Sequence, residues 1–370
     1  MSQPLILGAG PAGCAAAIVL AREGAAPLLL DRAEDPADAL CGGFLSWRTA
    51  ARLADLGVDP VALGAHRVTR LALFAGSSRA ELALPAPAFG LSRRALDCAL
   101  RQRAVAAGAR LAVDTARQID GMVVIGRLRR WSGDGLFLAA GKHDVRGAVR
   151  QRTSIDPALG LRVRLPSTPA RRHLLGGRIE LHLFAGGYAG IVLQEDGSAN
   201  VCLAVRKSRF GRAGGDTHAL LDQWTRTSPA FGERMGNDWR EFPPDTIGAV
   251  PYGYLARTSE PGLFRLGDQA AVIPSLAGEG IAIALASGSL AARYWLEGGA
   301  AAAPAFQRAF AGRAAWPVRA ASVAWALAER PLVARIGAGL AGSVPPVLRW
   351  LMETTRLDPP ASLARAHAAP

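Results

Sequence analysis

The chain has 370 residues, of which 50% are hydrophobic and 20% are charged, so it can form a large core and is not disordered in composition. Its net charge of +13 comes almost wholly from arginines spread along the chain, without interleaved aromatic residues or a nucleic-acid-binding motif. No apolar run approaches the roughly 20 residues that cross a bilayer. We therefore expect a globular protein that binds no nucleic acid.

The amino terminus leads directly into an apolar strand, with neither a basic segment nor a cleavage site. We therefore expect no signal peptide and a cytoplasmic location. The cysteines lie far apart without the spacing of metal ligands, so we expect free thiols and no metal site. They are Cys14, Cys41, Cys98 and Cys202.

The first motif is GAGPAG, near the amino terminus. The sequence predicts a strand at 5–7, a tight turn and a helix that begins at Pro11. Glycines in such a turn let the backbone approach a pyrophosphate, and the first amides of the helix point at it. A second strand at 28–30 ends in Asp31, about 20 residues further on, where a carboxylate can accept hydrogen bonds from a ribose. This pattern predicts a dinucleotide-binding βαβ unit. Its glycines are Gly8, Gly10 and Gly13.

A second motif of the same form, GAGLAG, has its glycines at Gly337, Gly339 and Gly342. No clear strand precedes it, and no acid follows at the right distance. Pro345 and Pro346 follow almost at once, and proline disfavours the helical conformation in the residue before it. We interpret this stretch as a small-residue crossing between two carboxy-terminal helices, and we expect a single dinucleotide site.

A strand predicted at 263–266 ends in Gly267 and Asp268, and a helix lined with small residues begins near Gly278, Glu279 and Gly280. The aspartate at a strand end could bind the ribityl chain of a flavin. The start of the helix could direct its partial positive charge at the pyrimidine edge of the flavin, where negative charge accumulates on reduction. An ordinary strand–loop–helix unit is the alternative.

Arg93, Arg94 and Asp97 open a further predicted helix that ends at Gly108. An arginine at such a helix start can reach phosphate or adenosine groups. The alternative is that both arginines are ordinary surface charges.

Together these stretches resemble the FAD-dependent oxidoreductases that share the p-hydroxybenzoate hydroxylase-like fold, and within them the geranylgeranyl reductase-like branch. The matching pieces are GAGPAG with Asp31-Arg32, CGGFLS at 41–46, Arg93 four residues before Asp97, GGYAG at 186–190, and GDQAAVIPSLAGEGIAIALASG from Gly267. The resemblance implies FAD as cofactor, bound by Gly8, Gly10, Pro11, Ala12, Gly13, Asp31, Arg32, Cys41, Gly42, Arg93, Gly267, Asp268, Gly278, Glu279, Gly280 and Ile281.

Two stretches depart from this family. Many members carry A-D-G-x-x-S, which often helps bind FAD and a nicotinamide cofactor, where this chain has AAGKHDVRG at 139–147. NADH and NADPH therefore both stay open as the transient reductant. Reductases of prenyl chains usually have a more aromatic version of the GGYAG strand, whereas Gly190 and Ile191 stand here.

The remaining segments predict mostly strands. Hairpin signals at 116–125, followed by 136–139, predict a small antiparallel sheet beside the dinucleotide domain. Strands dominate 159–205, and 178–184 alternates apolar and polar residues as in a half-buried sheet. The family places this sheet over the flavin, and it places the CGGF segment at 41–44 beside the isoalloxazine. Our candidates for lining the substrate pocket are therefore Tyr188 from the sheet and Cys41 and Phe44 from that segment; the catalytic residues stay unassigned.

The expected fold is α/β, or α+β overall: a Rossmann-like FAD-binding domain, an inserted antiparallel substrate sheet and a carboxy-terminal helical tail. We expect the FAD-binding domain at 1–60, 90–155 and 245–300, the substrate domain at 61–89 and 156–244, and the tail at 301–370. The tail, with breaks near Pro317 and Gly337, covers the sheet. Alternatively, it is an interfacial surface that contacts a membrane.

The function that we predict is that of an FAD-dependent oxidoreductase, reduced by NADH or NADPH and acting on a small apolar or aromatic substrate. The sequence favours a monooxygenase that hydroxylates its substrate, because no acid–base pair stands out and the prenyl-reductase strand is weakened. Reduction of carbon–carbon double bonds in a prenyl lipid is one alternative. A flavoprotein electron carrier that docks on a membrane or redox partner is another.

Overall fold

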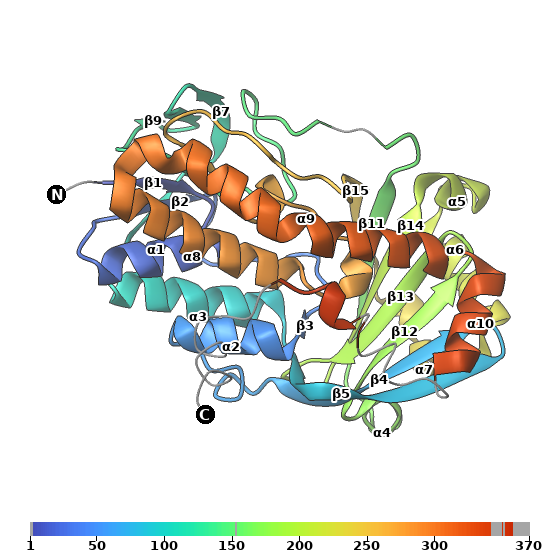
Figure 1. Ribbon diagram of the computed structural model, residues 1–370. Coiled ribbons are helices and arrows are strands. Elements are labelled where there is room, and N and C mark those ends of the chain that lie inside the picture. Colours follow the sequence, from blue (N-terminus) through green and yellow to red (C-terminus); the bar gives the residue numbers. More distant parts are fainter. Residues whose placement is uncertain (1–2, 152–153, 342–349, 351, 358–370) are drawn as a thin grey trace.

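The structure is a computed structural model that describes residues 3–151, 154–341, 350 and 352–357. Two large sheets lie side by side, and long helices run along the first and across to the second (Figure 1). The helices are α1 (Pro11–Arg22), α2 (Trp47–Asp55), α3 (Arg93–Ala106), α4 (Pro169–Leu175), α5 (Lys207–Arg212), α6 (Thr217–Thr227), α7 (Pro229–Met235), α8 (Gly280–Gly298), α9 (Ala303–Ala328) and α10 (Pro331–Ala341). Short 3-10 turns are η1 (Trp239–Glu241), η2 (Gly267–Gln269), η3 (Ser275–Ala277) and η4 (Gly299–Ala302).

The first sheet is parallel throughout and has the strand order β16-β10-β1-β2-β6. Its central strands are almost wholly apolar and buried, as expected of a parallel sheet covered on both faces. Helices α1 and α8 pack so closely that a Cβ at Gly288 would lie 2.2 Å from the carbonyl oxygen of Ala12. The strands are β1 (Leu5–Leu7), β2 (Leu28–Asp31), β6 (Arg110–Val113), β10 (Leu136–Leu138) and β16 (Leu263–Arg265).

The second sheet has the strand order β15-β11-β14-β13-β12-β4-β5-β3. Most neighbours are antiparallel, but β12 and β4 pair in parallel, so the sheet is mixed rather than antiparallel as expected. Its strands are β3 (Phe44–Leu45), β4 (His66–Ala75), β5 (Ser78–Gly90), β11 (Ala158–Leu165), β12 (Arg178–Phe184), β13 (Gly187–Leu193), β14 (Ala199–Arg206) and β15 (Asp245–Val250). A small third sheet contains β7 (Ala116–Asp120), β8 (Val123–Gly126) and β9 (Arg130–Trp131).

The mixed α/β architecture with a Rossmann-like sheet, a second sheet and carboxy-terminal helices confirms the predicted fold class. Two local predictions were wrong. Residues 136–139 do not join the small antiparallel sheet, because 136–138 form the parallel strand between β1 and β16. The third strand of the small sheet is Arg130–Trp131 instead. Residues 245–250 pair with β11 of the second sheet rather than with the first sheet.

The second sheet is also not half-buried at β12. Glu180 and His182, expected on an open face, are 0% and 1% exposed, because α7 covers them and its Arg234 donates to the Glu180 carboxylate at 2.8 Å. The alternation therefore separates a buried polar face from an apolar face that lines a cavity. The polar face carries Glu180 and His182, and the apolar face carries Ile179, Leu181 and Leu183.

The carboxy-terminal helices also differ from the prediction. Helix α9 continues through Pro317, which removes one backbone donor without ending the helix. Gly337 and Gly339 lie inside α10 and do not mark a crossing between two helices. Helix α10 packs on β4 and β5 of the second sheet (Figure 1). Gly342, Pro345 and Pro346 lie outside the described residues.

Candidate active site

The amino-terminal glycine turn is built so that only glycine fits at two of its positions. Gly8 has a φ of +106°, and a Cβ there would lie 2.3 Å from the carbonyl oxygen of Ala139. A Cβ at Gly13 would lie 1.9 Å from the carbonyl oxygen of Gly8. The turn can therefore fold back tightly, which brings the first turn of α1 to the end of β1.

Asp31 closes β2 next to this turn, and part of its hydrogen-bonding capacity is used inside the chain. Its Oδ2 accepts from the Ala9 amide at 2.7 Å, and its Oδ1 lies 3.1 Å from Arg101 Nη2. Arg101, which the sequence analysis missed, also donates to the Ala9 carbonyl at 3.1 Å. It follows Arg93 and Asp97 at intervals of four residues on α3, and this spacing was the available signal.

Arg93 lies directly above the glycine turn. It donates twice to Asp97, at 3.0 and 2.7 Å, and a Cβ at Gly10 would lie 3.6 Å from its Nη2. Burial disfavours the charge, but the Asp97 carboxylate outweighs burial and raises the pKa of Arg93. The space that a side chain at Gly10 would fill is thus faced by a permanent cation and by the start of α1, which suits a pyrophosphate.

A single cavity of about 510 Å³ brings together residues from both ends of the predicted flavin site. Gly267 lies against α1, since a Cβ there would be 3.2 Å from that of Ala12. The predicted residues that line the cavity are Gly10, Pro11, Ala12, Cys41, Gly42, Phe44, Arg93, Tyr188, Gly267, Asp268, Gly278, Gly280 and Ile281. The glycine turn beside α1 and the turn before α8 therefore face one continuous space.

Five predicted residues do not line this cavity. Gly8 and Gly13 form the turn itself, Asp31 closes the adjacent strand, and Arg32 is exposed. The Glu279 side chain is 1% exposed and pairs with Arg356 of the carboxy-terminal segment instead. Only the backbone of Glu279 stays beside the turn that begins α8.

The loop that carries Cys41 is held by side chains from three other segments. The carbonyls of Ala39, Leu40 and Cys41 each accept a hydrogen bond, at 3.1, 2.6 and 3.0 Å. Their donors are Arg162, Lys142 and Asn200 respectively. This loop is therefore rigid where it borders the cavity.

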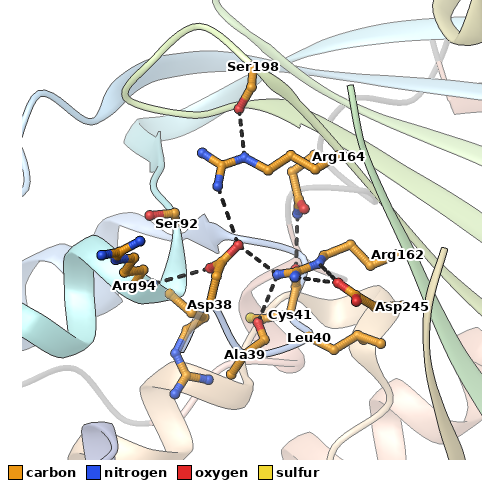
Figure 2. Close-up of polar contacts among 12 residues, drawn as sticks. Asp38, Ala39, Leu40, Cys41, Ser92, Arg94, Arg162, Arg164, Ser198 and Asp245 are labelled. Carbon is orange, nitrogen blue, oxygen red and sulfur yellow. Dashed lines mark hydrogen bonds and ion pairs between the residues drawn. The ribbon is translucent and has the colours of Figure 1, made fainter. Parts of the chain in front are cut away.

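The same loop is anchored by Asp38 (Figure 2). This carboxylate accepts from the Arg94 amide at 3.2 Å and from Arg162 at 2.9 Å, and Arg162 also binds Asp245. Arg162 thereby joins β15 and β11 of the second sheet to the loop that follows β2 of the first. The sequence offered no local signal for it, because Arg162 occurs within an ordinary alternating strand.

The segment at 139–147, which replaces the family's A-D-G-x-x-S stretch, is held in place by hydrogen bonds from Arg150. Arg150 donates to the Asp144 carboxylate at 2.7 Å, to the Lys142 carbonyl at 2.6 Å and to the Asp268 carbonyl at 3.0 Å. Gln269 donates to the carbonyls of the same segment at Gly141 and His143. The replacement segment is thus fastened to the turn that presents Asp268.

Beyond the predicted flavin position, the cavity continues as an apolar arm between the second sheet and the carboxy-terminal helices. Strands β4 and β12 form one wall, and α9 and α10 form the other. The lining residues of this arm include Leu71, Leu73, Ile179, Leu181, Leu183, Ala324, Leu327, Ala328, Ala334 and Ala338. Such a lining suits a long apolar molecule.

Three hydroxyl groups meet in the wall of the cavity. Tyr188 donates to Ser275 Oγ at 2.8 Å, and the Tyr252 hydroxyl lies 2.5 Å from the same atom. Burial raises the pKa of both tyrosines, so both phenols are protonated at neutral pH. Ser275 lies three residues before Gly278, next to the turn that begins α8. Sequence reasoning found Tyr188 but missed Ser275 and Tyr252, which come together only through the fold.

Comparison with known proteins identifies related folds and sequences. Residues 1–121 match the family model described as an FAD binding domain. Digeranylgeranylglycerophospholipid reductase 2 of Methanopyrus kandleri is 28% identical over 309 residues, which cover 78% of this chain and 75% of that protein. Menaquinone reductase of Mycolicibacterium smegmatis is 26% identical over 319 residues, covering 80% and 76%.

A solved structure is similar as well. The crystal structure of PqsL, a probable FAD-dependent monooxygenase from Pseudomonas aeruginosa, superposes with a TM-score of 0.68 at 16% identity. The match covers 91% of this chain and 99% of that one, which shows a shared fold. Among the described residues, no helix has the length and apolarity needed to cross a membrane.

Proposed function

We propose that this FAD-dependent oxidoreductase, whose amino-terminal third is an FAD binding domain, reduces a carbon–carbon double bond of a long apolar lipid of the isoprenoid type. The observation that carries the proposal is the apolar arm of the cavity. It leads away from the predicted flavin position between β12 and α10, and it is lined by leucines and alanines rather than by groups that would bind a polar ring. An extended hydrocarbon chain would bury its surface there.

The described residues fit FAD in the same cavity. Gly10 and Arg93 would hold the pyrophosphate, Asp268 the ribityl chain, and the turn before α8 the pyrimidine edge. When bound, FAD supplies the hydride, which it receives from NADH or NADPH. The pinned loop around Cys41 would keep one side of the isoalloxazine pocket rigid and dry.

Reduction of a double bond also needs a proton for the second carbon. Tyr188 is the candidate, because its phenol is protonated and lies in the cavity wall next to the turn that begins α8. Transfer of its proton to carbon would leave a tyrosinate, and Ser275 and Tyr252 would return a proton from the more exposed side. The full reaction consumes one nicotinamide hydride and one proton for each double bond saturated.

The relatives support a reductase over the hydroxylase that the sequence favoured. One is named as a reductase of a digeranylgeranylglycerophospholipid and the other as a reductase of menaquinone, and each aligns over about three quarters of its own length. Of the two departures that weakened this interpretation, Gly190 lines the cavity beside Leu181, where it leaves room, and Ile191 is buried in a core cluster of the second sheet and does not line the cavity.

Hydroxylation is the second candidate. It is supported by the fold shared with PqsL and by the same dry cavity, since a hydroxylating flavoenzyme needs no protein nucleophile. The two reactions differ in their need for dioxygen and in what is added to the substrate.

The test is turnover of an isoprenoid lipid with NADPH or NADH, run once under nitrogen and once in air, with products weighed by mass spectrometry. We expect saturation under nitrogen, with the mass of two hydrogens gained for each double bond. A product that forms only in air and has gained one oxygen atom would establish the hydroxylase instead. If nicotinamide is consumed in air without any change in the lipid, both candidates are wrong for that substrate.

A further inference from the structure

The carboxy-terminal segment 352–357 returns to the turn that begins α8 and forms part of the cavity wall. Met352, Thr355 and Arg356 line the cavity together with Gly278 and Gly280. This segment is far from the turn in sequence, and Arg356 and Glu279 are 77 positions apart. Residues 352–357 therefore complete the cavity wall beside the predicted flavin site.

Two ion pairs hold this segment: in one the segment supplies the carboxylate, and in the other it supplies the arginine. Arg48 of α2 binds Glu353 of the segment and donates to the Leu357 carbonyl at 2.5 Å. In return, Arg356 of the segment binds Glu279. The first pair is partly exposed, with side chains 19% and 35% accessible, whereas those of the second are 4% and 1% accessible.

The buried pair is the unusual one, because removing two charges from water carries a large desolvation cost. The guanidinium of Arg356 also lies 4.0 Å above the Trp47 ring. Its Nε is buried and has no hydrogen-bond partner among the described residues. A buried arginine with an unused donor at a cavity wall is poorly explained by folding stability alone.

We propose that Arg356 is a positioning residue for the flavin, which fixes the Gly278–Gly280 turn through Glu279 and sets the charge beside the bound isoalloxazine. The turn itself is tightly backed, since Gly278 has a φ of +69° and a Cβ there would lie 2.9 Å from Phe44. On its other side the turn is anchored through the Glu279 carboxylate, which pairs with Arg356 and accepts a hydrogen bond from the Ser46 side chain. The inference is independent of whether the substrate is reduced or hydroxylated.

The test compares Arg356→Gln, Arg356→Lys, Glu279→Gln and the control Arg48→Gln. The control loosens the same segment but leaves the Arg356–Glu279 pair in place. FAD dissociation constants are measured by titration of the apoprotein, and flavin midpoint potentials by equilibration with redox dyes. We expect Arg356→Gln to weaken FAD binding at least about ten-fold, Arg356→Lys to recover part of this loss, and Arg48→Gln to stay within about two-fold.

The flavin midpoint potentials distinguish an electrostatic role of Arg356 at the flavin from a purely structural one. Loss of the cation in Arg356→Gln should lower the midpoint potential, because negative charge on the reduced flavin is then less stabilised. Loss of the anion in Glu279→Gln should raise it. Equal FAD affinity in Arg356→Gln, or potentials that shift in the same direction in both variants, would overturn the proposal.

Two further outcomes are also decisive. If Arg356→Gln fails to fold, Glu279→Gln still gives the sign of the potential shift, and an unchanged potential in that variant refutes the proposal. If the wild-type protein binds no FAD, the flavin site as a whole is wrong, and this result is distinct from a failure confined to Arg356.

Discussion

Gly13 shows how a single side chain can decide whether the cofactor turn forms. A methyl group there would overlap the Gly8 carbonyl, and that carbonyl belongs to the turn itself, so no flexible neighbour can yield. We expect Gly13→Ala to weaken FAD binding at least about ten-fold and to destabilise the protein by about 2 kcal/mol or more. The measurements are FAD titration and thermal unfolding.

The matched control is Gly312→Ala in α9, where nothing lies within 4 Å of the added carbon. Alanine is the better helix former, so this variant should keep its FAD and gain up to about 1 kcal/mol of stability. Equal FAD affinity and equal thermal stability of the two variants would show that the amino-terminal turn can accommodate a side chain at Gly13.

Tyr188 gives the second prediction at the scale of single residues. If its phenol supplies the proton, Tyr188→Phe should lower turnover about 100-fold or more while FAD binding stays within about two-fold. Tyr254→Phe, which removes a hydroxyl outside the cavity lining, is the control and should turn over normally. Turnover of Tyr188→Phe close to the wild-type rate would remove Tyr188 from the reaction.

Residues that act through local sequence could be predicted, and residues that act through the fold could not. Gly10, Arg93 and Asp268 belong to recognisable motifs, and the structure places them around one cavity. Arg162 and Arg356 escaped notice because their partners are distant in sequence, at Asp38 and Glu279. An arginine among 43 basic residues carries no sign of burial until its partner is known.

Among the elements, β12 separates the apolar arm on one face from a buried polar cluster on the other, which contains Glu180, His182 and Arg234 of α7. His182 Nε2 lies 3.0 Å from Glu180, and its Nδ1 is buried without a partner among the described residues. Since the carboxylate can only accept, the imidazole donates to it from Nε2. Burial lowers the pKa of His182 below its usual value of 6.5, although Glu180 opposes the effect.

A pH dependence of stability follows from this lowered pKa. The unfolded chain takes up a proton near pH 6.5 and the folded chain does not, so this contribution is complete above pH 6.5 and is lost as the pH falls. We expect the free energy of unfolding to fall by about 1 kcal/mol between pH 6.5 and 5.5. His182→Phe, which can still stack on Phe74, should flatten the slope in urea unfolding with saturating FAD. The exposed His173→Gln is the control, and equal slopes in the two variants would contradict the assignment.

Helix α10 combines two apolar faces. Ala334 and Ala338 are buried, whereas Leu332, Ile336 and Leu340 are 70%, 54% and 57% exposed and recur every fourth residue. We propose that this outer stripe rests on a membrane surface, with exposed arginines nearby, so that lipid enters the apolar arm beside the helix. The double variant Leu332→Ser/Ile336→Ser should then lose binding to anionic phospholipid vesicles in a sedimentation assay.

The control is Val61→Ser/Val105→Ser, which removes two exposed apolar side chains, 62% and 51% accessible, that lie outside α10. The α10 variant should keep its activity on a detergent-dispersed substrate, because the buried alanines are unchanged. Vesicle binding that is equally strong in both double variants would place the membrane contact elsewhere or rule it out.

For the whole molecule, strands β1, β2 and β16 of the first sheet were predictable, because buried parallel strands read as short apolar runs. Strand β10, which lies between β1 and β16, was assigned to the small antiparallel sheet instead. The second sheet was harder. Its parallel pairing of β4 with β12 joins segments about 100 residues apart, and no periodicity in either strand encodes that choice. The arm of the cavity arises from this pairing together with α9 and α10, so its apolar character and its length became visible only in the structure.

In the proposed reaction, one apolar cavity presents a lipid double bond to reduced FAD without any need for dioxygen. The most direct measurement is a single turnover: the flavin of the purified protein is reduced chemically under nitrogen and an isoprenoid lipid is then added. We expect the flavin absorbance to return in proportion to the lipid added, with a matching amount of saturated product. A flavin that stays reduced until air is admitted, together with product that contains a new oxygen atom, would contradict it.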